Sequence, residues 1–93
     1  MKQWIAPAQL TIFDVRRVQT ELEEQQLFIA DCAVDLSAIE ELDTSGAQLL
    51  LYWMQTAERL HKRWQLTGCN TVVDETFALL GGYPATMERR SHV

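Results

Sequence analysis

Four consecutive small or polar residues, Asp43, Thr44, Ser45 and Gly46, are the part of this sequence whose types and spacing point most clearly to chemistry. They follow an apolar segment that ends at Leu42 and precede apolar residues at helical spacing, so they fall where a helix should begin. The first turn of a helix carries free backbone N–H groups and the positive end of its dipole. A hydroxyl displayed there can receive a phosphate, which adds a charge of about −1.5 to −2 at neutral pH. Simple N-capping by Thr44 or Ser45 is the alternative role, and both roles can hold together.

The rest of the sequence does not suggest an enzyme active site or a metal centre. His61 and His92 have no nearby residues with which to form a metal site or a catalytic base, and the sequence contains no phosphate-binding glycine loop. Cys32 and Cys69 form no tight motif, and we expect both to be small buried side chains. We therefore expect no catalytic residues, no metal and no cofactor.

Length and charge restrict the other function classes. The 93 residues suit one domain, 1–93, with an ordered core over about 4–82 and a loosely held tail at 83–93. The net charge of −5 should be repelled by phosphate backbones, which argues against nucleic-acid binding. The sequence has neither an apolar run that would cross a bilayer nor the apolar core of a secretory signal. The expected location is the cytoplasm, with no direct membrane insertion.

Hydrophobic periodicity predicts alternating strands and helices. Asp14 is a candidate N-cap of the first helix, and Asn70 or Thr71 of the last, which should end at Gly81. In chain order the expected elements are an edge hairpin over the first ~13 residues, a helix from 14, a central strand at 33–37 covered on both faces, a helix at 45–61, a strand near 64–66 and a final helix.

This element order predicts an α/β fold with a mostly parallel or mixed sheet of about four short strands and helices packed mainly on one side. The helix at 45–61 is apolar almost all round in its first half, because Leu49, Tyr52 and Trp53 add to its inward stripe. Either neighbouring elements or a partner must cover this second stripe. A second copy of this chain, forming a homodimer through Trp53 and Leu60, is one candidate for such a partner.

The sequence resembles the STAS domain, the sulfate-transporter and anti-sigma-factor-antagonist family. The resemblance rests on Val-Asp-Leu-Ser at 34–37, Leu-Asp-Thr-Ser-Gly at 42–46, the helix through 49–51, and Trp-Gln-Leu-Thr-Gly at 64–68. It covers about residue 4 to about residue 82. One departure is Ala47-Gln48, where many members carry an apolar residue followed by a small one.

The resemblance implies a bacterial protein that acts by binding and not by catalysis. In the anti-sigma-antagonist branch, the hydroxyl after the loop aspartate is phosphorylated by a partner kinase, often the anti-sigma factor itself, and a phosphatase reverses this. That residue is Thr44 here, with Ser45 the weaker candidate. In a second branch the domain is a constitutive subunit of a phospholipid-trafficking ABC transporter ATPase complex, and Thr44 would never be modified. A third group serves chemotaxis or two-component signalling.

By the same resemblance, the partner-binding surface comprises the loop before the second helix and the first turns of that helix. Asp43 would hold the loop or contact the partner, and Gly46 would let the partner approach the backbone closely. Glu40 and Glu41 would steer the surface toward a basic partner. The complete predicted set is Ile39, Glu40, Glu41, Asp43, Thr44, Ser45, Gly46, Gln48, Leu49 and Trp53.

Overall fold

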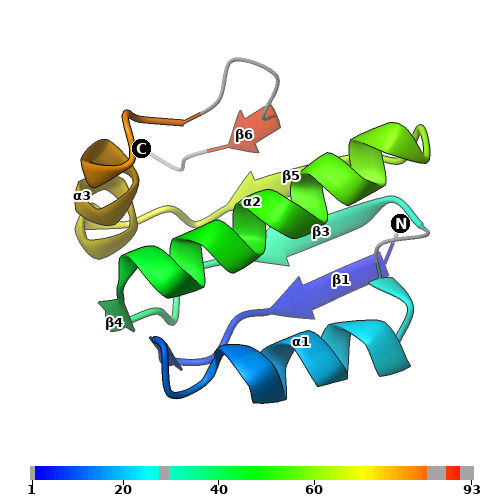
Figure 1. Cartoon of the computed structure of the whole chain (residues 1–93). Helices are drawn as coiled ribbons and strands as arrows, with labels where there is room; N and C mark the ends of the chain where they lie inside the picture. The colour runs from blue at the N-terminus through cyan, green and yellow to red at the C-terminus, as the bar shows by residue number, and fades with distance from the viewer. Residues whose placement is uncertain (1, 28–29, 84–87, 91–93) are drawn as a thin grey trace.

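Residues 2–27, 30–83 and 88–90 are described by a computed structural model of the chain, shown in Figure 1. The main sheet has four parallel strands in the order β1-β3-β5-β6. Its strands are β1 (Lys2–Ile5), β3 (Cys32–Asp35), β5 (Trp64–Thr67) and β6 (Glu88–Arg90).

A second, two-stranded parallel sheet pairs β2 (Gln9–Leu10) with β4 (Glu41–Leu42). The helices are α1 (Val15–Glu24), α2 (Thr44–Arg59) and α3 (Thr71–Leu79). Each crossover helix returns the chain to a parallel strand, as the alternating order requires.

The core lies between the helices and one face of the main sheet. Trp4, Val34 and Leu66 are register partners on β1, β3 and β5, and all three are buried. Figure 1 shows α1 and α2 running side by side across this face. The expectation of a mostly parallel sheet with helices mainly on one side is therefore confirmed. The expectation that the central strand is covered on both faces is wrong, because Ala33 and Asp35 point the other way and are only half-buried.

The residues that the sequence predicted at helix ends lie at helix ends in the structure. Asp14 is the N-cap residue of α1, and the Asn70 side chain caps α3 by accepting a hydrogen bond from the Val73 N–H at 3.0 Å. Gly81 follows the end of α3 with a φ of 95°, a left-handed conformation that glycine adopts without strain. The predicted cap positions are therefore confirmed, but the Asp14 side chain makes no capping hydrogen bond to α1 and bonds to Thr11 instead.

The predicted N-terminal hairpin is wrong. β1 and β2 belong to different sheets, and each pairs in parallel with a distant strand: β1 with β3 and β2 with β4. Short apolar segments that follow one another suggest a hairpin. Here the stronger constraint is burial, because Trp4 and Leu10 must each reach a core position beside a later strand.

Two parts of the predicted tail at 83–93 are described by the structure, Tyr83 and β6. Tyr83 stacks on Phe77 with ring centroids 4.7 Å apart, and its hydroxyl donates a 2.7 Å hydrogen bond to Asp74. Burial, followed by the hydrogen bond to Asp74, raises the pKa of this hydroxyl. Further on, β6 pairs with β5, so this part of the tail extends the sheet. The other residues of the predicted tail, 84–87 and 91–93, lie outside the described residues.

Neighbouring elements cover part of the second apolar stripe of α2. Leu49 and Trp53 are buried, whereas Tyr52 and Leu60 are exposed. Cys32 and Cys69 are free and buried, as expected.

The central position of Leu66 predicts the effect of truncating it. Leu66→Ala should lower the free energy of unfolding by about 2–5 kcal/mol, because a fully buried side chain leaves a cavity. Leu79→Ala, at a residue of α3 that is 78% exposed, is the control and should change it by less than about 0.5 kcal/mol. Urea denaturation measures both. Equal losses in the two variants would contradict the assignment of the core.

Candidate functional site

The parallel pairing of β2 with β4 brings two loops together at the N-terminus of α2. Leu10 lies opposite Leu42, so the residues after each strand, 11–14 and 43–46, leave the small sheet side by side. The Asp43 N–H donates to the Leu10 carbonyl at 3.4 Å, which continues the ladder by one residue. This pairing places the predicted Asp-Thr-Ser-Gly motif beside the loop at 11–14.

Asp43 connects the two loops through its carboxylate. Its Oδ1 accepts a 2.9 Å hydrogen bond from the Gly46 N–H and thereby caps α2. Its Oδ2 accepts a 2.9 Å hydrogen bond from the Ile12 N–H in the other loop. The geometry therefore gives Asp43 the loop-holding role, one of the two roles that the sequence left open.

Thr44 is exposed at the first position of α2. Since Asp43 is the N-cap, Thr44 and Ser45 are not needed for capping. No hydrogen bond involves the Thr44 hydroxyl within the ranges that the structure covers. Ser45 is half-buried and lines a shallow groove between α1 and α2, together with Val15, Gln19, Gln48, Leu49 and Tyr52. Of the two candidate phosphoacceptors, Thr44 is the more accessible.

Gly46 is buried and packs against β2 and β4 of its own chain. A Cβ at this position would collide with the carbonyl oxygen of Leu10 and would lie 2.9 Å from the Leu10 and Leu42 side chains. The glycine is therefore required by the close approach of α2 to β2.

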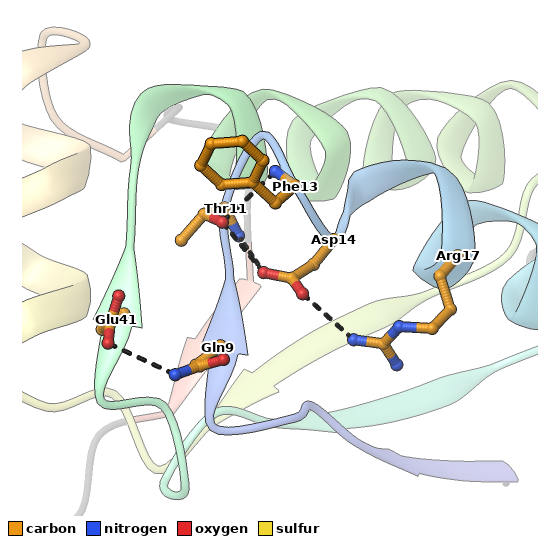
Figure 2. Close-up of polar contacts among 6 residues, drawn as sticks. All are labelled: Gln9, Thr11, Phe13, Asp14, Arg17 and Glu41. Atoms are coloured by element: carbon orange, nitrogen blue, oxygen red, sulfur yellow. Dashed lines mark hydrogen bonds and ion pairs between the residues drawn. The ribbon is translucent and has the colours of Figure 1, made fainter.

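The remaining predicted surface residues divide by burial. Glu40, Glu41 and Gln48 are exposed. Figure 2 shows the Gln9 amide donating a 3.3 Å hydrogen bond to Glu41 across the small sheet. Ile39, Leu49 and Trp53 are buried and support the surface from beneath.

Sequence reasoning missed the loop from Thr11 to Asp14. The Asp14 Oδ2 accepts hydrogen bonds from the Thr11 N–H at 3.1 Å and the Thr11 hydroxyl at 2.9 Å, as Figure 2 shows. These bonds lower the pKa of the Asp14 carboxyl, and an ion pair with Arg17 at 3.3 Å acts in the same direction. The loop leaves Ile12 and Phe13 exposed. The Thr-x-x-Asp spacing was the available signal, because it is typical of a side-chain-stabilised turn.

The described part of the chain contains no group of three or more His, Cys, Asp and Glu side chains placed to hold a metal ion. None of the helices in these ranges has the length and apolar character that crossing a membrane requires.

Comparison with known proteins identifies the family. A family model described as "Mlab, STAS domain" matches residues 10–82, and the chain therefore belongs to the STAS domain family, as the motifs predicted. A crystal structure of a Thermotoga maritima protein, provisionally assigned as an anti-sigma factor antagonist, superposes with a TM-score of 0.78. The match covers 98% of this chain and 80% of that one at 12% identity, so it shows the shared fold. No curated protein sequence matches the chain.

The double role of Asp43 predicts graded effects of two substitutions. Asp43→Asn keeps one acceptor oxygen but loses the other, and should lower the free energy of unfolding by about 1 kcal/mol. Asp43→Ala loses both and should cost about 2 kcal/mol. Urea denaturation measures the losses, and amide hydrogen exchange should show reduced protection of the Ile12 N–H in Asp43→Ala, which has no acceptor left. Unchanged protection of that amide in Asp43→Ala would contradict the two-loop connection.

The close packing at Gly46 predicts that Gly46→Ala destabilises the protein, whereas helix propensity predicts the opposite sign. Helix propensity alone would make Gly46→Ala stabilising by about 1 kcal/mol. The collision with Leu10 should instead lower the free energy of unfolding by about 3 kcal/mol. Gln48→Ala, at an exposed position two residues further along α2, is the control and should change stability little. A more stable Gly46→Ala variant in thermal unfolding would show that α2 does not pack as described.

Proposed function

We propose that this chain is a non-enzymatic regulatory protein-binding module of the bacterial cytoplasm, similar in role to an anti-sigma factor antagonist. Its partner-binding surface is formed by the exposed residues around the N-terminus of α2. Phosphorylation of Thr44 by a partner kinase switches binding, and a phosphatase restores it. Membership of the STAS family and the fold shared with the Thermotoga maritima protein support this proposal.

The observation that carries the proposal is that Asp43, and not Thr44, caps α2, so that the Thr44 hydroxyl stays exposed. Asp43 satisfies the helix N-terminus, and the neighbouring Thr44 is exposed. A kinase therefore reaches the Thr44 hydroxyl without dismantling the start of α2.

The effect of a phosphate differs between the free and the bound protein. In the free protein, water and the positive end of the α2 dipole stabilise the added charge, so the fold persists. In a complex, the phosphate lies in the interface beside the Asp43 carboxylate and has to lose its hydration. Where the partner presents an apolar surface to Thr44, the phosphate is left as an unpaired charge in the interface, and binding weakens.

The second candidate function is a constitutive STAS subunit of a phospholipid-trafficking ABC transporter ATPase complex. Membership of the STAS family supports this role as well, because the resemblance includes a branch of such transporter subunits. In this role the exposed Thr44 contacts the ATPase directly and is never modified.

Thr44→Glu tests the switch, and the chain offers a matched control. Thr71 is also exposed at the first position of its helix, directly after the N-cap Asn70. Thr71→Glu therefore adds the same charge at the same helical position on α3. In affinity capture from the native cell lysate, a kinase partner should be lost with Thr44→Glu but retained by Thr44→Ala and Thr71→Glu. Intact mass of the recovered wild type should show a phosphate-sized increment.

Two other outcomes decide against the switch. A kinase bound equally by wild type, Thr44→Ala and Thr44→Glu would show that charge at this position does not control binding. An ATPase retained by all variants, with no added mass on wild type, would establish the transporter subunit instead.

A further inference from the structure

The most exposed large apolar side chain among the described residues belongs to Phe13, which is 93% exposed. Its neighbour Ile12 is 57% exposed. Scattered apolar residues on a protein surface are common and do not by themselves indicate a binding site. The support around Phe13 and its position relative to α2 distinguish it from the others.

The loop that carries Phe13 is held by hydrogen bonds at every backbone N–H from Thr11 to Val15. The Phe13 N–H donates to the Thr11 hydroxyl at 3.3 Å, and the N–H groups of Asp14 and Val15 donate to the Thr11 carbonyl at 2.8 and 3.1 Å. The other two N–H groups bond to the carboxylates of Asp14 and Asp43. Figure 2 shows the bonds that converge on Thr11 and the Phe13 ring beside them. A fixed loop backbone loses less conformational entropy on association than a mobile one.

The loop is part of the same end of the molecule as the proposed binding surface. The Ile12 N–H bonds to Asp43, the residue directly before Thr44. Val15, two residues after Phe13, lines the groove between α1 and α2 whose other wall includes Leu49 and the half-exposed Tyr52. Phe13 thus extends the predicted surface with an aromatic side chain of the kind that commonly anchors protein interfaces.

Charge indicates the chemistry of the occupant. The exposed carboxylates of Glu40 and Glu41 lie on the loop and strand that lead to Asp43, and the whole chain carries a net charge of −5. A partner protein that receives the Phe13 ring and also faces these carboxylates needs an apolar pocket for the ring and basic residues at its border.

We infer that Phe13 is the anchor residue of the partner interface: its ring enters an apolar pocket, rimmed by Lys or Arg, on the protein that docks at the N-terminus of α2. This inference rests on the proposed function, since it requires that this surface binds a protein. The Phe13 ring would add an apolar contact to the interface that Thr44 does not supply, and the partner would carry the complementary pocket.

The test uses the full chain and first fixes the partner without involving Phe13. Benzoylphenylalanine in place of the exposed Gln48 forms a photo-crosslink to the protein bound at α2 in cells, and mass spectrometry identifies that protein. Purified partner is then titrated with wild type, Phe13→Ala and Leu79→Ala. Leu79 is the matched control because it is a large apolar residue, 78% exposed, on α3.

Phe13→Ala should weaken the partner's affinity by about 30-fold or more, while Leu79→Ala leaves it unchanged. The same complex should weaken as salt is raised, and Glu40→Gln should slow association. Thermal unfolding of Phe13→Ala should match wild type, because the ring is exposed. A crosslink from position 13 should map to an apolar pocket bordered by basic residues.

The remaining outcomes overturn the inference in distinguishable ways. If Thr44→Glu weakens binding and Phe13→Ala does not, the inference is wrong and the proposed function stands. If no protein crosslinks at position 48, both fail. Phe13-dependent self-association in sedimentation velocity would make a second copy the occupant. Phe13-dependent binding to vesicles of phosphatidylcholine and phosphatidylglycerol would make it a lipid surface.

Discussion

The carboxylate of Asp43 accepts hydrogen bonds from Gly46 and from Ile12, a residue 31 positions earlier in the chain. One bond starts α2, and the other fixes the loop that precedes α1. The collision that any side chain at Gly46 would make with Leu10 shows how closely these two parts of the chain approach. This contact joins the loop that carries Phe13 to the residue directly before Thr44. The small β2–β4 sheet, with only two residues in each strand, is the framework that makes the contact possible.

Two helices in this fold begin in the same way, and the comparison shows what is particular to α2. Asp43 precedes Thr44 as Asn70 precedes Thr71, and each cap side chain accepts a hydrogen bond from the N–H three residues on. Asn70 uses its amide to donate to the Ile39 carbonyl, which keeps the loop before β4 in place. Asp43 uses its second oxygen to hold an exposed loop. The start of α3 is therefore structural, whereas the start of α2 adjoins side chains that face outward.

The features that the sequence predicted correctly depend on interactions between residues close in the chain. Capping by Asn70, the glycine stop at Gly81 and the apolar stripe of α2 are local signals, and the structure has each of them. The predicted hairpin was wrong because strand pairing over long range does not follow from adjacency. The loop at 11–14 was missed because Ile12 and Phe13 have the composition of a strand. The hydrogen bonds that keep them out of a sheet come from Asp14 and from the distant Asp43.

The sequence by itself determined the family, the helical positions and the prediction of Thr44 at a helix N-terminus, since the Asp-Thr-Ser-Gly motif and the apolar periodicity are read from neighbouring residues. Only the tertiary structure decided which residues of the motif are accessible. Gly46 is covered by Leu10, Asp43 is used by two loops, and Leu49 and Trp53 are buried against neighbouring elements. Burial depends on which segments pack together across the fold. The parallel pairing of β2 with β4 brings Leu10 onto Gly46, and the spacing of residues in the motif does not reveal this contact.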